Sequence, residues 1–183
     1  MVRIQPLDPQ TATGTSKELL DQIAQKNGKA INIQRVLAHS PAALQAYLGI
    51  SGALREGSLS PAIRERIALV VAQKNSCDYC LAAHTFLGER AGLSEEEILA
   101  ARSGEAEGEK ERAVVEFSRT LVRERANVGD EELQRLREAG LSQGEIVEVV
   151  ANVVANIFTN YINHVADTPV DFPAAPVLES AGR

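Results

Sequence analysis

The sequence has few of the residues that mark secreted, disulfide-stapled or membrane proteins. Among 183 residues it has no tryptophan, three tyrosines, four phenylalanines and only two cysteines, too few for the disulfide framework of a small secreted domain. The sequence contains no run of 18 consecutive apolar residues, so it predicts no transmembrane helix. Residues 1–15 lack the basic-then-apolar order of a secretory signal. We therefore expect a cytoplasmic protein without a membrane partner.

Positive charge is also scarce. The chain has 25 acidic and 19 basic side chains, which gives a formal net charge of −6. Its lysines and arginines are dispersed, whereas binding to a phosphate backbone needs a concentrated basic patch. We therefore expect no nucleic-acid partner.

The residues that are present favour helices. Hydrophobic residues make up 44% of the chain, enough for a sizeable core, and no segment shows the alternation of a strand. We predict one all-α domain over residues 1–183 with about seven or eight helices. Residues 1–14 and 168–183 are expected to be extended segments, the latter because it contains three prolines. These are Pro169, Pro173 and Pro176.

Short signals mark the starts of several helices. Ser40-Pro41 and Ser60-Pro61 each predict an N-cap followed by a first-turn proline. The Ser-x-x-Glu patterns at 94–97 and 142–145 predict capping boxes. Between residues 31 and 39 the pattern is less regular, and no helix is assigned there.

A weak internal repeat offers one interpretation of this organisation. Sliding the chain by 80 residues lays Glu65 on Glu145 and His84 on His164, together with several apolar positions. Two copies of a helical unit, only one of them with thiols, would explain the match. Chance similarity between apolar helices explains it about as well, so both interpretations stay open.

The two cysteines and a nearby histidine form the most informative motif. On a helix, Cys77, Cys80 and His84 lie three and then four positions apart, which puts both sulfurs and the imidazole on one face. The break at residues 74–76 places Cys77 at a helix start, where the helix dipole lowers the pKa of a thiol. We favour Cys80 as the nucleophile because His84, one turn away, can take its proton, and Cys77 as the resolving thiol.

Glu65 is the candidate supporting carboxylate. If the break at residues 74–76 reverses the chain, Glu65 lies roughly 15 Å back from the turn and His84 roughly 12 Å beyond it. The two side chains would then be neighbours. Two other interpretations remain: Glu65 as an ordinary ion-pair partner of an arginine, and the Cys77, Cys80 and His84 set as a zinc site or as inert packing.

The spacing of these residues matches a known family. Glu65 is followed twelve residues later by Cys77, then by Cys80, and four positions further by His84. This pattern resembles the core motif of the alkylhydroperoxidase D (AhpD-like) and carboxymuconolactone decarboxylase superfamily. The resemblance extends over about residues 32–173 and implies an all-helical fold that oligomerises.

The resemblance also implies roles for single residues. In the peroxidase branch the second cysteine attacks the peroxide, the first resolves the sulfenic acid, and a Glu and a His relay protons. Carried over, these residues are Cys80, Cys77, Glu65 and His84. AhpD proper has a further histidine between its cysteines, where this chain has Tyr79, which is either a supporting phenol or a packing residue.

The partners implied by the resemblance are a hydroperoxide substrate, an external dithiol reductant and further copies of the chain. No bound cofactor or metal is required. The decarboxylase branch uses no cysteine pair for its lactone chemistry. The alternatives are a decarboxylase-like enzyme, a general disulfide reductase, and a metal-binding or structural helical oligomer.

A polar stripe on the last long helix is the remaining candidate. Its members recur every four residues on an otherwise apolar segment. They form either a solvated face or the lining of a cavity above the thiols or of a contact between subunits. The residues are Asn152, Asn156, Asn160 and His164.

Overall fold

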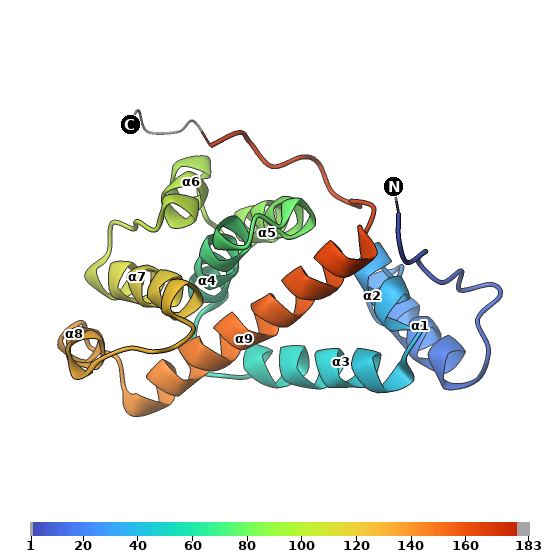
Figure 1. Ribbon diagram of the computed structural model, residues 1–183, viewed down its shortest axis with the longest axis horizontal. Coiled ribbons are helices and arrows are strands. Elements are labelled where there is room, and N and C mark those ends of the chain that lie inside the picture. The colour runs from blue at the N-terminus through green and yellow to red at the C-terminus, as the bar shows by residue number, and fades with distance from the viewer. Residues whose placement is uncertain (1, 179–183) are drawn as a thin grey trace.

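The computed structural model describes residues 2–178, which form nine α-helices and no β-strand (Figure 1). The all-α expectation is therefore confirmed. The helices are α1 (Gly14–Asn27), α2 (Asn32–Leu37), α3 (Pro41–Arg55), α4 (Pro61–Lys74), α5 (Asp78–Arg90), α6 (Glu95–Ser103), α7 (Glu109–Glu124), α8 (Asp130–Glu138) and α9 (Gln143–Ala166).

The helix that the sequence did not predict is α2. It has only six residues, too few for a periodic pattern to stand out. Its first turn is capped by Gln34, whose Oε1 accepts a hydrogen bond from the backbone N–H of Ile31 at 3.0 Å. Ile33, Val36 and Leu37 are buried, so tertiary packing rather than a long amphipathic pattern stabilises this helix.

The structure does not confirm the internal repeat. In the first half of the chain, α4 and α5 are separate helices joined by a sharp turn. The matching residues of the second half lie in α9, which is one continuous helix of 24 residues. A duplicated unit would require a break in α9 where the structure has none.

The core is organised around α4. Every residue of α4 from Arg66 to Ala72 is buried, and the helix packs against α5, α6, α7 and α9, which surround it in Figure 1. One large apolar cluster lies between α4, α7 and α9, and a second joins α1, α2 and α3 to the start of α5. None of the helices within residues 2–178 is long and apolar enough to cross a membrane.

The two end segments pack against this core without regular secondary structure. Residues 2–13 and 168–178 contain no helix or strand, while Met1 and residues 179–183 of the expected extended segments lie outside the described residues. Figure 1 shows the C-terminal segment passing over α5 towards α6. Arg102 on α6 donates to the backbone carbonyl of Pro176 at 2.7 Å, which fastens the segment there.

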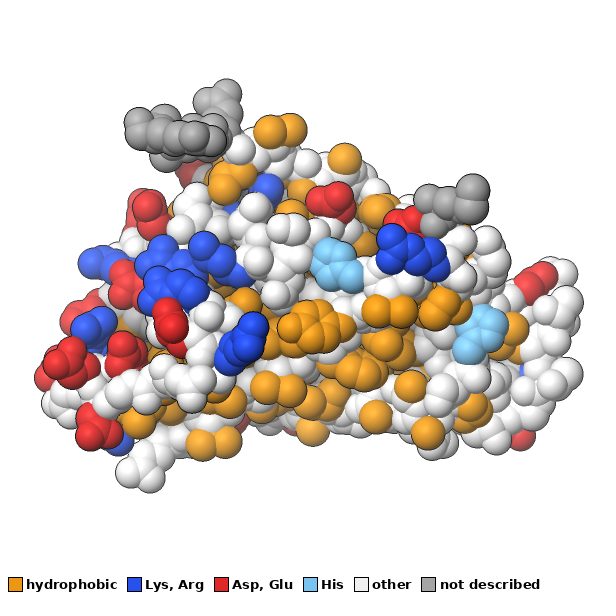
Figure 2. Space-filling view, viewed as in Figure 1, with side chains coloured by type: hydrophobic (Ala, Val, Ile, Leu, Met, Phe, Trp, Pro, Cys, Tyr) orange, Lys and Arg blue, Asp and Glu red, His pale blue; other side chains and the backbone are white. Residues whose placement is uncertain are grey.

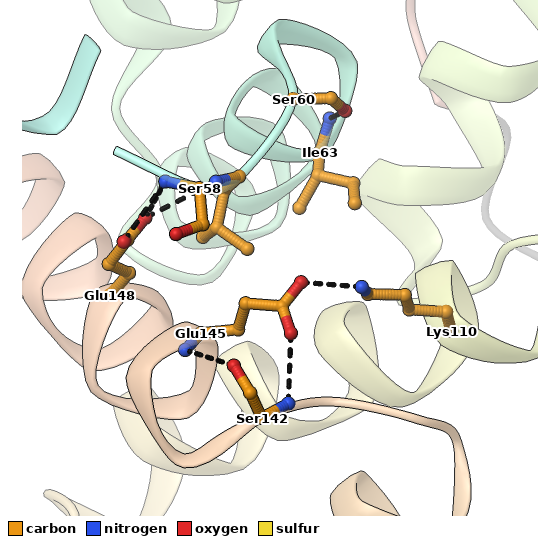
Figure 3. A network of polar contacts seen from close by, with 8 residues as sticks. Ser58, Ser60, Ile63, Lys110, Ser142, Glu145 and Glu148 are labelled. Atoms are coloured by element: carbon orange, nitrogen blue, oxygen red, sulfur yellow. Dashed lines mark hydrogen bonds and ion pairs between the residues drawn. The ribbon is translucent and has the colours of Figure 1, made fainter. Parts of the chain in front are cut away.

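The start of α9 is tied to the rest of the fold by two glutamates (Figure 3). Glu145 completes the predicted capping box with Ser142 and also accepts from Lys110 Nζ at 2.5 Å. Glu148 accepts from the backbone N–H of Ser58 at 2.8 Å and so holds the link between α3 and α4. The hydrogen bonds from Lys110 and then Ser142 lower the pKa of Glu145 to about 2.

The depressed pKa of Glu145 predicts an acid-dependent loss of stability. A carboxyl group that titrates near 4.5 when unfolded and near 2 when folded stabilises the protein above its unfolded pKa and ceases to do so as the pH falls towards 2. Glu145→Gln should lower the free energy of unfolding by about 1 kcal/mol at pH 7. The difference from the parent should shrink between about pH 4.5 and pH 2.

Urea unfolding across that pH range measures the effect. Glu116→Gln, at an exposed site on α7, is the matched control and should leave stability nearly unchanged. An equal deficit for Glu145→Gln at pH 7 and pH 2.5 would contradict this account.

Candidate functional site

The candidate site is built on the turn between α4 and α5. Helix α4 ends at Lys74, and Ser76 adopts the left-handed conformation with φ of 54°. The backbone N–H of Cys77 then donates to the carbonyl of Ala72 at 3.0 Å, which closes the turn. The expected break at residues 74–76 therefore does reverse the chain, and α5 runs back alongside α4.

Both cysteines lie at the start of α5, as the sequence predicts. Cys77 is the N-cap residue, and its sulfur accepts a hydrogen bond from the backbone N–H of Cys80 at 3.3 Å. The two residues are joined by a disulfide, with their Cα atoms 5.3 Å apart. Only 2% of Cys77 and 3% of Cys80 is exposed. The pair is thus buried at a helix N-terminus.

The surroundings of the cysteines are apolar. Both belong to the cluster formed by α1, α2, α3 and the start of α5. Tyr47 of α3 and Phe158 and Ile162 of α9 are partly buried and pack against this cluster. An apolar environment suits a substrate with a hydrocarbon group better than a highly charged one.

Glu65 and His84 meet across the α4–α5 hairpin. Glu65 Oε2 lies 2.8 Å from His84 Nδ1, and each side chain is about one-fifth exposed. This is the neighbourhood that the hairpin arithmetic predicts. A carboxylate that accepts from Nδ1–H holds the imidazole in the tautomer whose Nε2 is free to take up a proton.

Tyr79, between the cysteines, binds the C-terminal segment. Its hydroxyl donates to Asp171 Oδ2 at 2.6 Å and accepts from the backbone N–H of Ile33 at 3.3 Å. The ring of Phe172 packs edge-on against it, with centroids 6.0 Å apart. Burial and the hydrogen bond to Asp171 raise the pKa of Tyr79 far above its usual range. The phenol therefore stays protonated and bonded to Asp171 at neutral pH.

The end of α9 reaches the same turn. Asn160 is fully buried, and its Oδ1 accepts from Asn75 Nδ2 at 2.8 Å. His164 is exposed, and its Nε2 lies 2.8 Å from the backbone carbonyl of Asn75. Asn160 and His164 thus hold the residue that caps α4, two positions before Cys77.

The other half of the polar stripe does not reach the turn. Asn152 Nδ2 donates to the backbone carbonyl of Glu148, and Asn156 Nδ2 to that of Asn152, each at 2.8 Å. Both side chains bond within their own helix. The structure therefore brings Asn160 and His164 to the cysteine turn and leaves Asn152 and Asn156 away from it.

Asn163 is a site residue that the sequence analysis missed. Its Nδ2 lies 3.3 Å from Cys80 Sγ, and the residue is 6% exposed. A stripe spaced at four residues drifts about 40° per step around a helix, which is why it led to exposed His164. The buried face of α9 instead runs through positions 146, 149, 153, 160, 163 and 166, which lie three, four or seven residues apart. A polar residue on that face was the available signal.

Tyr47 was also missed as a neighbour of the site, because in sequence it is one apolar position of α3. Burial raises the pKa of Tyr47, a hydrogen bond with Ser51 and the charge of Arg55 oppose the rise, and the charge of Glu65 adds to it. Tyr47 packs against the apolar cluster that contains both cysteines.

Metal ligation was one alternative for these residues. Within residues 2–178, no group of three or more His, Cys, Asp or Glu side chains is arranged to hold a metal ion. Cys77 and Cys80 are joined to each other, and His84 is bonded to Glu65.

Part of the chain matches a known protein family. Residues 41–120 match the carboxymuconolactone decarboxylase family, a range that contains the α4–α5 hairpin and all four motif residues. No curated protein matches the chain by sequence.

Several solved structures share the fold. A peroxidase-related protein of Ralstonia eutropha JMP134, described as an alkylhydroperoxidase AhpD core, superposes with a TM-score of 0.82 at 18% identity, over 93% of this chain and 92% of that one. A peroxidase-related protein from Silicibacter sp. TM1040 gives 0.77 at 19% identity, over 91% and 92%. The debrominase Bmp8 in complex with 2,3,4-tribromopyrrole gives 0.78 at 18% identity, over 93% and 92%. At these identities the likeness is one of fold.

Proposed function

We propose that this chain, whose residues 41–120 match the carboxymuconolactone decarboxylase family and whose fold is that of an AhpD-like protein, is a thiol-dependent peroxidase that reduces organic hydroperoxides. The observation that carries the proposal is the pairing of two features on one hairpin. A cysteine pair lies in a disulfide at the start of α5, and a Glu65–His84 hydrogen bond of 2.8 Å lies one turn further along.

The first chemical step is oxidation of Cys80. His84, oriented by Glu65, takes the thiol proton, and the Cys80 thiolate attacks the terminal oxygen of the hydroperoxide. The O–O bond breaks, the sulfur keeps the terminal oxygen as a sulfenic acid, and the alkoxide leaves with the proton held by His84. One hydroperoxide becomes one alcohol.

The second step regenerates the thiols through Cys77. The Cys77 thiol attacks the sulfenic sulfur, an S–S bond forms and water leaves, which gives the disulfide present in the structure. An external dithiol then supplies two electrons and two protons by thiol–disulfide exchange and is itself oxidised to a disulfide. This cycle needs no bound cofactor, and it suits the reducing cytoplasm, where such dithiols are maintained.

The principal alternative is a general disulfide reductase. It would use the same cysteine pair without a peroxide, and the disulfide is equally compatible with it. The debrominase Bmp8 shares the fold at 18% identity, so cysteine-bearing members of this fold need not all act on one substrate. Dependence of thiol loss on a hydroperoxide distinguishes the two functions.

We predict different outcomes for the two cysteine variants. Cys80→Ser should abolish hydroperoxide consumption because it removes the nucleophile. Cys77→Ser should allow one turnover and then stop, because no second thiol resolves the sulfenic acid. Mass spectrometry after one equivalent of peroxide, with a sulfenic-acid trap, should find the adduct on Cys80. An adduct on Cys77 in the Cys80→Ser protein, with full single-turnover yield, would reverse the assignment.

Glu65→Gln tests the carboxylate. The substitution keeps the shape of the side chain and removes the charge that favours the imidazolium form of His84. We expect a higher apparent pKa of the reactive thiol and peroxide reduction slower by roughly 10–10⁴-fold, with little change in thermal stability.

Glu97→Gln is the matched control, since Glu97 forms an ion pair with Arg66, the neighbour of Glu65 on α4. It should leave the thiol pKa and the rate unchanged. Full activity and an unchanged thiol pKa for Glu65→Gln would reduce Glu65 to a structural ion-pair residue.

We also propose that the chain forms a homo-oligomer through the outer face of α9. Four large apolar side chains are exposed there, and their spacing of seven, seven and four residues puts them on one face. Figure 2 shows hydrophobic side chains gathered in a band across this side of the molecule. Exposed apolar surface of this kind favours association. The residues are Val147, Val154, Tyr161 and Val165.

Val154→Glu should dissociate the oligomer, because it buries an unpaired charge at the centre of that face. Sedimentation velocity at micromolar concentration measures the change. Val177→Glu is the control: Val177 is 88% exposed in the C-terminal segment, away from α9, and the substitution should leave the assembly intact. Sedimentation of the parent protein as a 19.7 kDa species would contradict the proposal.

A further inference from the structure

One contact at the cysteines has no role in the proposed cycle of peroxide reduction. Helix α9 carries Asn163 into the apolar cluster, where its Nδ2 lies 3.3 Å from Cys80 Sγ. The two residues are 83 positions apart in the sequence. A side-chain amide nitrogen is only a donor, and a sulfur accepts a hydrogen bond more strongly as an anion than as a thiol or a disulfide.

The amide is placed at a cost to stability. Among the described residues, Asn163 Oδ1 is buried and has no hydrogen-bond partner. A buried unpaired carbonyl is destabilising, and an apolar side chain would fit this position at lower cost. Among the described residues, the side chain of Asn163 forms its hydrogen bond through Nδ2, to Cys80. This contact with the sulfur is therefore what explains an asparagine at this position.

We propose that Asn163 is a catalytic residue whose amide N–H holds the negative charge of Cys80, both when its thiolate attacks the hydroperoxide and when it leaves as the disulfide is reduced. In the second case the dithiol attacks the Cys77 sulfur, the S–S bond breaks, and the electron pair goes to Cys80. The inference rests on the proposed peroxidase function and adds the residue that makes Cys80 the nucleophile.

The two sulfurs differ in what surrounds them. Cys77 receives one backbone N–H, that of Cys80, at the helix start. Cys80 lies within the first turn, where His84 one turn on can take its proton and Asn163 from another helix can hold the remaining charge. In the proposed cycle Cys80 therefore has His84 as its proton acceptor and Asn163 as its side-chain donor.

Several titratable groups on the elements around Cys80 are already bonded. Glu65 is bonded to His84, Tyr79 to Asp171, and Glu97 at the start of α6 to Arg66. His164 on α9 is bonded to the carbonyl of Asn75, and Tyr47 on α3 to Ser51. These groups set a common background for the Cys80 thiol. A change at Asn163 alone then reports the contribution of its amide.

The test measures the ionisation of Cys80 without a peroxide. In a Cys77→Ser background Cys80 is the only thiol, and its alkylation rate by iodoacetamide as a function of pH gives its pKa. Asn163→Leu, which is similar in size and has no donor, should raise that pKa by about one unit and slow sulfenic-acid formation near neutral pH roughly tenfold. Asn163→Asp keeps the size but places a carboxylate beside the sulfur, and should raise the pKa at least as far.

Asn152→Leu is the matched control. Asn152 lies on the same helix and is 5% exposed, and its side chain donates to the carbonyl of Glu148 within that helix, so its loss should not move the thiol pKa. An unchanged pKa in a folded Asn163→Leu protein overturns the inference, and if Asn163→Leu does not fold, Asn163→Ala, which also removes the donor and adds no charge, decides. A raised pKa without hydroperoxide reduction by the parent protein would refute the peroxidase proposal and leave Asn163 as the donor to Cys80.

Discussion

The reversal of the chain at Ser76 is the constraint on which the site depends. A residue with φ of 54° lets the chain reverse within the three residues that connect α4 to α5, so that α5 runs back along α4. Glu65 near one end of α4 and His84 in the second turn of α5 then come within 2.8 Å. Both sulfurs lie at the start of α5. A longer connection would allow the same residues in the sequence but would not bring the carboxylate to the imidazole.

Helix α9 explains why this turn keeps one geometry. Its first half fills the main apolar cluster with residues such as Val149 and Val153, while its last turns replace apolar side chains by amides. Asn160 and His164 bond to Asn75 at the end of α4, and Asn163 reaches Cys80. Buried polar groups of this kind cost stability unless they are bonded. The same helix therefore supplies the packing of the fold and the polar contacts of the candidate site.

The sequence predicted those parts of the structure that depend on local spacing. The all-α class, the capping boxes at Ser94 and Ser142, and the meeting of Glu65 with His84 all follow from short-range periodicity and one chain reversal. Helix α2 was missed because six residues are too short for periodicity. The contact of Asn163 with Cys80 was missed because it joins helices distant in the sequence. The repeat is not confirmed, because similar apolar patterns do not require similar chain breaks.

The motif position between the two cysteines, Tyr79, has a structural role in this chain. AhpD proper has a histidine between its cysteines, whereas here the hydroxyl of Tyr79 is bonded to Asp171 and to the backbone of α2. With the phenol used in this way, the proposed mechanism needs groups outside the CxxC segment to balance the charge on Cys80. His84 is one such group, and α9 brings the amide of Asn163 to within 3.3 Å of the sulfur from the other side. In the proposed mechanism a tyrosine at position 79 is compatible with a reactive thiol, because a neutral donor holds charge without having to change its own protonation state.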